Sequence, residues 1–197
     1  WDLHDAATGE ILFKATGSGD NGRGMAAQLS STDRGSYFSS SNDRQQRSAI
    51  TGAVASSGST SMNFRIFWDG DLQEELFDGG KIEKWNGNGT SRLYVNGKNP
   101  YDYNASKTCN SSKSTPNLQA DFIGDWREEI ILWSGNDNST LNIFTTNMSS
   151  TFRVPTLMHD HTYRMGIAWQ NVAYNQPPHI GYYLPDSVGG RIYQAEL

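Results

Sequence analysis

The chain has 197 residues and a net charge of −5, from 16 Lys and Arg against 21 Asp and Glu. This balance argues against nucleic-acid binding, which needs basic stripes, and no apolar run reaches the roughly 18 residues of a membrane helix. Aromatic residues make up 12% of the chain, so it can bury a core, and a single cysteine, Cys109, excludes an intramolecular disulfide. The sequence starts at Trp1 in mid-pattern, so we expect a fragment or a processed piece whose export signal would lie upstream.

Short runs rich in aromatic and β-branched residues predict strands along the whole chain. In order they are residues 11–14, 64–68, 72–77, 81–85, 92–95, 129–133, 141–145 and 163–169. Asp-Gly and Asn-Gly pairs between the runs indicate tight hairpins, and helical periodicity is almost absent. Residues 64–85 are the clearest stretch, a predicted meander of three strands. Loops are expected at residues 16–24, 39–60 and 86–115.

A weak internal repeat indicates the architecture. Residues 70–77 (GDLQEELF) resemble residues 124–131 (GDWREEII), and residues 32–38 are a fainter copy. Repeats of roughly 40–50 residues with several strands each are typical of propeller blades. We therefore predict an all-β fold, a β-propeller, whose blades here could close a small ring or be part of a larger one. The alternative is a chance likeness between hairpin turns.

Residues 121–129 (DFIGDWREE) carry oxygen-bearing side chains at intervals of four around a Gly-Asp turn. Calcium takes about 6–8 oxygen ligands, so this stretch is a candidate calcium loop. The alternative is a solvated acidic hairpin that Arg127 neutralises. The candidate calcium ligands are Asp121, Asp125 and Glu129, then Asp69 and Asp71 at the matching place in the first copy, and finally Asn171 and Asn175.

Other motifs carry weaker signals. His159 and His161 alternate, so on a strand both imidazoles would point the same way and could bind a transition metal, although hydrogen-bonded structural histidines are the simpler interpretation. Residues 17–22 spell Gly-x-Gly-x-x-Gly without a βαβ context, so we expect a tight turn there that presents Asp20 and Arg23. Cys109 lies in a polar loop without an activating neighbour, which argues against a nucleophilic thiol.

Several blocks of the sequence resemble a known family. They are residues 118–130, 155–160 with Tyr163 and Arg164, and 167–179 (IAWQNVAYNQPPH), together with residues 18–27 and 67–72. These blocks resemble family 11 of the polysaccharide lyases, the rhamnogalacturonan lyases, from Trp1 to about Leu184. The resemblance implies an eight-bladed β-propeller that binds several calcium ions (Ca²⁺). It also implies that residues 1–197 are the C-terminal portion of this catalytic domain, with the N-terminal blades absent from the chain.

The same resemblance implies cleavage of the rhamnose–galacturonate backbone of rhamnogalacturonan I, a pectin, by β-elimination. This reaction removes the C5 proton of a uronate and expels the C4 oxygen, so it needs a base and a cation at the carboxylate. No water attacks, so it does not require the carboxylate pair of a glycosidase. The alternative is a carbohydrate-binding β-propeller without activity, and a protein-interaction propeller is a third class.

The resemblance also places site residues. A substrate-binding arginine falls at Arg23 and a cleft tyrosine at Tyr174, and we expect Lys113 or Tyr174 to transfer the proton. The expected substrate-binding residues are Arg23, Asn110, Ser111, Ser112, Lys113 and Tyr174. The alternative is that these groups only bind sugar. Ser111 and Ser112 replace the family's Gly-Thr, and Gln28 and Ser30 stand where the family has carboxylates, which puts a calcium site there in doubt.

Five Asn-x-Ser/Thr sequons occur, at Asn88, Asn104, Asn110, Asn138 and Asn147. Asn110 belongs to the expected cleft, where a glycan would block the substrate. We therefore expect a bacterial protein that is secreted, or that lies at the cell surface or in the periplasm.

Overall fold

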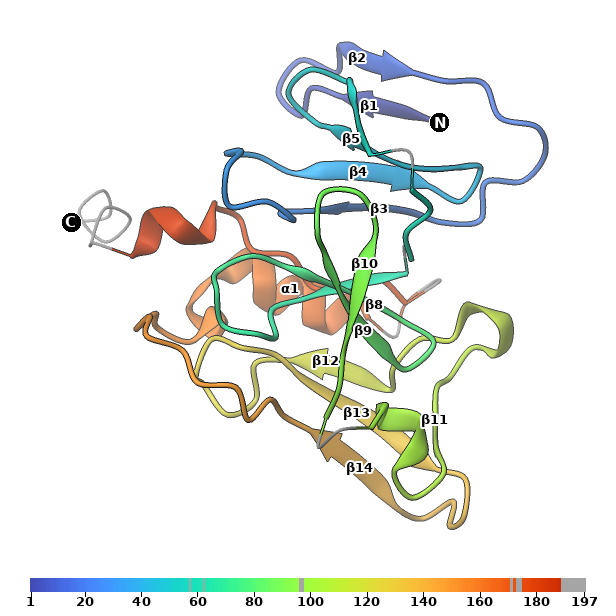
Figure 1. The fold of residues 1–197 in the computed structure, drawn as a ribbon, viewed down its shortest axis with the longest axis vertical. Helices are drawn as coiled ribbons and strands as arrows, with labels where there is room; N and C mark the ends of the chain where they lie inside the picture. The colour runs from blue at the N-terminus through green and yellow to red at the C-terminus, as the bar shows by residue number, and fades with distance from the viewer. Residues whose placement is uncertain (57, 62, 96–97, 171, 173–174, 189–197) are drawn as a thin grey trace.

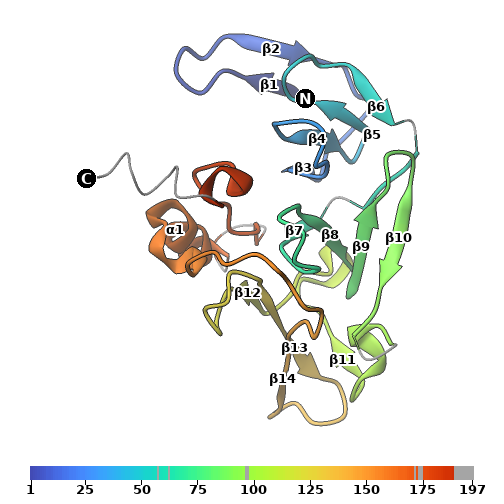
Figure 2. The same cartoon turned by 60° about the vertical axis from the view of Figure 1, so that its left-hand side comes forward.

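The computed structural model describes residues 1–56, 58–61, 63–95, 98–170, 172 and 175–188, which form antiparallel β-sheets and one α-helix (Figure 1). The sheets follow one another along the chain. Figure 2 shows them side by side in an open arc, with α1 on its inner side. The prediction of an all-β fold is confirmed in this coarse sense. No helix in this part of the chain has the length and apolar character needed to cross a membrane.

The sheets are made of sequence neighbours. The first pairs β1 (Asp2–His4) with β2 (Ile11–Lys14). The second is ordered β3 (Gly24–Ala27), β4 (Tyr37–Ser40), β5 (Asp43–Ser48), β6 (Val54–Ser56). The third is ordered β7 (Phe64–Ile66), β8 (Glu75–Asp78), β9 (Lys81–Trp85), β10 (Thr90–Leu93). The fourth contains β11 (Ser106–Lys107), β12 (Leu118–Ala120), β13 (Glu129–Ser134) and β14 (Leu141–Phe144).

Short helical segments complete the described chain. The α-helix α1 spans His161–Trp169. The 3₁₀ turns are η1 (Pro100–Asp102), η2 (Ser111–Lys113), η3 (Leu157–His159) and η4 (Leu184–Ser187). The turn η2 carries part of the site described below.

The core forms between the third and fourth sheets. Phe64 pairs with Phe77, and Phe77 pairs with Ile82 across β7, β8 and β9, so the three side chains lie on one face. They pack against Ile130 and Leu132 of β13, and all five are fully buried. The predicted three-strand meander at residues 64–85 is therefore confirmed, and β10 extends it to four strands.

The internal repeat corresponds to a repeated turn. Gly70 and Gly124 have φ angles of 85° and 82°, and two residues later Leu72 and Trp126 have φ angles of 73° and 70°. Positive φ is unusual for leucine and tryptophan, so its recurrence at matching places shows that the likeness is structural rather than chance. The two turns lead into β8 and β13, which follow β7 and β12 along the chain and pair with them.

The predicted strand at residues 163–169 is wrong, because these residues form α1. The Asp160 carboxylate accepts a hydrogen bond from the Thr162 backbone N–H (3.1 Å) and caps the helix. Tyr163 is fully buried, and Ile167, four residues later, packs against the same cluster, which is helical spacing. The paired arrangement of His159 and His161 on a strand is also wrong, because His159 ends η3 and His161 begins α1.

The expected loop at residues 39–60 is also wrong, because it contains β5 and β6. These strands are polar, yet Gln46 of β5 is fully buried. Its side-chain N–H group donates to the hydroxyls of Thr60 (2.6 Å) and Ser39 (3.3 Å). Hydrogen bonds between buried polar side chains stabilise this sheet where aliphatic residues are scarce.

Candidate functional site

A small polar pocket forms where segments far apart in the sequence meet. The cavity has a volume of about 300 Å³, and its lining residues are Asp20, Asn21, Gly22, Arg23, Gly24, Lys113 and Gln176. Lys113 reaches it from η2, and its Nζ donates to the Gly22 carbonyl oxygen (3.2 Å). A Cβ atom at Gly22 would lie 2.8 Å from that Nζ, so glycine is what allows the ammonium to approach the backbone.

Arg23 connects this pocket to the chain around residue 175. Its Nη1 donates to the Asn175 carbonyl oxygen (3.3 Å). The Asn175 side-chain N–H group donates in turn to Thr115 Oγ1 (3.1 Å), two residues beyond Lys113. Burial lowers the pKa of Arg23, and the nearby Asp78 carboxylate raises it. Arg23 is therefore linked through Asn175 to the segment that carries Lys113, while it lines the cavity.

The segment that carries Lys113 has an unusual backbone. Asn110, Ser111 and Ser114 all have left-handed φ angles, of 59°, 49° and 49°. Asn63 stabilises this turn, because its side-chain N–H group donates to the carbonyl oxygen atoms of Lys113 (2.5 Å) and Ser114 (3.2 Å). The conformation at Ser111 favours glycine, which is the residue that the resembling family has there.

Positive side chains gather beside the pocket. Burial raises the pKa of the Asp78 carboxyl, while the positive charges of Arg23, Arg44 and Lys81 lower it. Arg44 and Lys81 are exposed. The pocket itself is lined by the cations of Arg23 and Lys113 and by the carboxylate of Asp20, and its two positive side chains suit an anionic ligand.

The structure thus brings together Arg23 and Lys113, which sequence reasoning singled out. It places Asn110, Ser111 and Ser112 in the turn beside them. Gln176 is an additional lining residue, and its signal was its place in the block 167–179. Tyr174 and Asn171 lie outside the described residues.

A second group of polar residues lies at the first copy of the repeated turn. Ligand atoms of Asp69, Asp71 and Glu75 all lie within 4.8 Å of one another, and this group could bind a metal ion. Lys84 of β9 lies among them, with its Nζ at 2.8 Å, 2.6 Å and 2.8 Å from the three carboxylates. Burial raises the pKa of Glu75 to about 8, although Lys84 lowers it. Sequence reasoning missed Glu75, although it matches Glu129 in the repeat.

At the second copy, protein donors surround the predicted calcium ligands. Asp121 accepts hydrogen bonds from the backbone N–H groups of Gly124 (2.8 Å) and Leu157 (2.9 Å). Asp125 forms an ion pair with Arg127, as the acidic-hairpin alternative predicts. Among the described residues, the grouped carboxylates are therefore those of the first copy rather than these.

Glu129 shows why the two copies differ. Its carboxylate accepts from the backbone N–H groups of Phe122 (2.7 Å) and Ile123 (3.1 Å) and from Thr145 Oγ1 (3.2 Å). Continuing the register of β13 and β14 by one residue places Thr145 beside Glu129. Continuing that of β8 and β9 in the same way places Lys84 beside Glu75. A neutral hydroxyl therefore occupies the position that the ammonium has in the first copy. Asn175 is also engaged, through its side-chain N–H group to Thr115.

Comparison with known protein families gives one match over nearly the whole chain. The model described as rhamnogalacturonan lyase family 11, C-terminal domain, matches residues 1–191. The rhamnogalacturonan endolyase YesW of Bacillus subtilis is 42% identical over 188 residues, which are 94% of this chain and 29% of that protein. The rhamnogalacturonan exolyase YesX of the same species is 41% identical over 198 residues, 92% of this chain and 31% of that protein.

Solved structures agree. The crystal structure of rhamnogalacturonan lyase YesW has a TM-score of 0.79 at 39% identity and covers 93% of this chain, which spans 30% of that one. A Bacillus licheniformis rhamnogalacturonan lyase has a TM-score of 0.78 at 40% identity, with the same two coverages. The chain thus spans less than a third of the length of these relatives.

Proposed function

We propose, since this chain belongs to rhamnogalacturonan lyase family 11 and matches its C-terminal domain, that the whole protein cleaves rhamnogalacturonan I by β-elimination. The activity is proposed for the whole protein because this chain spans only 29% of the length of YesW and 31% of the length of YesX. One observation carries the proposal. A guanidinium and an amine, Arg23 and Lys113, line the same cavity from segments ninety residues apart in sequence, as a uronate-cleaving site needs.

In the proposed mechanism, Lys113 or Tyr174 accepts the C5 proton of the galacturonate unit. The electron pair of the C–H bond becomes the C4–C5 double bond, and the C4 oxygen leaves with the rhamnose-bearing part of the chain and takes up a proton. Arg23 balances the carboxylate charge, which grows as the C5 carbanion forms. Asn110, Ser111 and Ser112 hold sugar hydroxyls beside it.

We further propose that the sheets are consecutive blades of a propeller, and a repeated contact between sheets supports this. The Glu74 backbone N–H donates to the Gln28 carbonyl oxygen (2.9 Å), and the Gln28 N–H donates to the Glu74 carboxylate (2.6 Å). Glu128 and Phe67 make the same pair of hydrogen bonds, both at 2.9 Å. The third sheet is thus joined to the second, and the fourth to the third, in the same way, which is the geometry that a ring of blades repeats. The N-terminal part of the protein would supply the remaining blades.

We propose calcium as the cation of the acidic group. Carboxylate oxygens suit a hard cation, and Asp69, Asp71 and Glu75 carry more negative charge than Lys84 balances. Calcium binding there would displace the Lys84 ammonium from the three carboxylates. The loop with Asp121, Asp125 and Glu129 is a second proposed position, which requires its carboxylates to exchange backbone N–H donors for the ion.

In the whole protein, Lys84→Met is expected to increase the dependence of the melting temperature on calcium. Removal of the ammonium leaves three neighbouring carboxylates without their counter-ion, and an ion that binds only the folded state stabilises it by RT ln(1 + [L]/Kd). Melting curves in chelator and in excess calcium measure the shift. Lys81→Met, a substitution of an exposed lysine on the same strand, is the control. Equal shifts in the two variants would argue against a cation at this group.

We also propose that the protein acts outside the cytoplasm of a bacterium, by secretion or at the surface or in the periplasm, because its proposed substrate is a polymer. Fractionation of the producing cells, with the protein followed by antibody, tests this.

The lyase proposal is tested on the products. The whole protein is incubated with rhamnogalacturonan I, and the ultraviolet absorbance of the C4–C5 double bond conjugated with the carboxylate is followed. Homogalacturonan, which lacks rhamnose, is the control polymer. Polymer binding without new absorbance would favour the carbohydrate-binding alternative. New chain ends without absorbance would indicate a hydrolase.

A further inference from the structure

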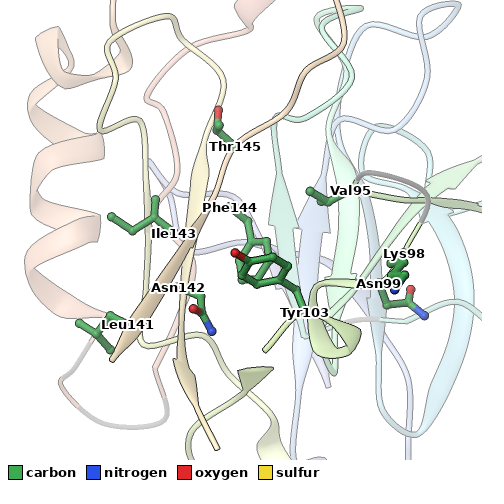
Figure 3. Close-up of a pocket in the computed structure, with 9 residues that line it drawn as sticks. All are labelled: Val95, Lys98, Asn99, Tyr103, Leu141, Asn142, Ile143, Phe144 and Thr145. Carbon is green, nitrogen blue, oxygen red and sulfur yellow. The ribbon is translucent and has the colours of Figure 1, made fainter. Parts of the chain in front are cut away.

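A groove runs along the outer edge of β14. Its cavity has a volume of about 450 Å³, and the lining residues are Val95, Lys98, Asn99, Tyr103, Leu141, Asn142, Ile143, Phe144 and Thr145. All four residues of β14 line it, and in Figure 3 the Phe144 side chain lies toward Tyr103, whereas those of Leu141 and Ile143 lie on the other side of the strand. Leu141 and Ile143 are 58% and 64% exposed, a high value for aliphatic side chains on a strand. Tyr103 stands over Phe144 with ring centroids 5.9 Å apart.

The internal repeat indicates that a strand is missing at this edge. The two copies of the repeated turn connect β7 to β8 and β12 to β13, so these strand pairs match. The next strands along the chain, β9 and β14, pair with β8 and β13 and therefore also match. β10 pairs with the far edge of β9. Within the described part of the chain no strand pairs with the far edge of β14. In the described part of the chain, the fourth sheet thus has no counterpart of β10.

β11 does not fill this place. Trp133 of β13 pairs with Lys107 of β11 and also with Leu141 of β14. A strand residue has one neighbour on each side, so β11 and β14 lie on opposite edges of β13. β11 therefore continues the edge that β12 occupies, and no strand among the described residues covers the outer edge of β14.

The register shows which backbone groups are open. The Ser134 N–H donates to the Thr140 carbonyl oxygen, so Thr140 faces β13. Backbone groups alternate along a strand, so those of Asn142 also face β13, and those of Leu141 and Ile143 point into the groove. Such a row of unpaired groups is a template for an added strand.

We infer that β14 accepts a further β-strand from the part of the same polypeptide that lies outside this chain. The inference rests on the proposed function, because it assumes that the whole protein has the length of its relatives, of which this chain spans 29% to 31%. A strand tethered in the same molecule binds at a high effective concentration. Its side chains on the Phe144 face would be apolar, to pack on Phe144 and Tyr103.

Hydrogen exchange of the whole protein tests this without any substitution. The amides of Leu141 and Ile143 are expected to exchange roughly 10²-fold more slowly than that of Thr90. Thr90 lies on the edge of β10 that no strand of the described residues covers, because the Asn86 N–H bond to the Gly89 carbonyl places the Thr90 amide outward. Equal, fast exchange at both edges would overturn the inference.

A proline pair gives an independent measurement. Ile143→Pro removes one outward N–H and leaves the β13 pairing intact, so only an added strand would lose a hydrogen bond. The melting temperature of the whole protein is expected to fall more for Ile143→Pro than for the matched Thr90→Pro. Equal falls would contradict an added strand.

In the hydrogen-exchange experiment, protection of Ile143 that disappears on dilution would indicate a second copy instead and would also overturn the inference. Lyase activity is scored separately, so failure of the proposed function is distinguishable from an open edge.

Discussion

Lys113→Ala in the whole protein is expected to lower turnover of rhamnogalacturonan by roughly 10²-fold or more if this amine is the base. Lys113 lines the same cavity as Arg23 and donates to the Gly22 carbonyl, so its loss would remove the proposed base from that cavity. Initial rates from product absorbance, measured over a range of polymer concentrations, separate kcat from KM. Lys14→Ala, at an exposed lysine of β2, is the control.

Lys113→Arg tells the base from a cation that only binds. Arginine keeps the positive charge but does not deprotonate in proteins, so a base would lose as much turnover as in Lys113→Ala. If the arginine variant keeps near-normal kcat and only KM rises, Lys113 binds sugar and the proton goes elsewhere. Tyr174→Phe is the matching test of the second candidate. Arg23→Ala should weaken both binding and rate, because its charge faces the carboxylate in ground and transition states.

The strands that aromatic and β-branched residues mark could be predicted from sequence. Residues 11–14 and 81–85 match β2 and β9 residue for residue. The polar strand β5 could not be predicted, because its burial depends on Gln46 hydrogen bonds to hydroxyls that come from other segments. The helix α1 was missed because its composition resembles that of a strand. Two helix signals were present in the sequence, the Asp160 cap and the four-residue spacing of Tyr163 and Ile167.

The candidate site divides in the same way. Arg23 and Lys113 were found by resemblance to a family, since nothing in the spacing of the two residues predicts that they meet. Lys84 could not be found, because its role depends on the register of β8 and β9, which brings it beside Glu75. Sequence motifs and family resemblance therefore indicate candidate residues, and the packing of segments and the pairing of strands decide which of them are neighbours.

Glu128→Ala is expected to cost about 3–5 kcal/mol of unfolding free energy, because it breaks a fully buried ion pair. Arg65 Nη1 lies 2.7 Å from the Glu128 carboxylate, and Arg65 Nε lies 3.0 Å from that of Glu74. Arg65 and Glu128 have no exposed side-chain surface. The same carboxylate accepts hydrogen bonds from the Tyr163 hydroxyl (2.7 Å) and the Phe67 N–H (2.9 Å). Loss of the Glu128 carboxylate leaves the Arg65 guanidinium with less negative charge to balance it. It also leaves the Tyr163 hydroxyl and the Phe67 N–H without this buried acceptor.

The urea midpoint of the whole protein measures this cost, and Asp186→Ala is its control. Asp186 pairs with Arg34, whose side chain is 69% exposed, so that substitution should cost less than about 1 kcal/mol. Glu128→Gln keeps the shape and part of the hydrogen bonding, so its cost should fall between the two. A loss as small for Glu128→Ala as for the control would mean that Glu74 alone balances Arg65. In that case the side-chain hydrogen bond between Glu128 and the Phe67 N–H would add little to the joining of the third and fourth sheets.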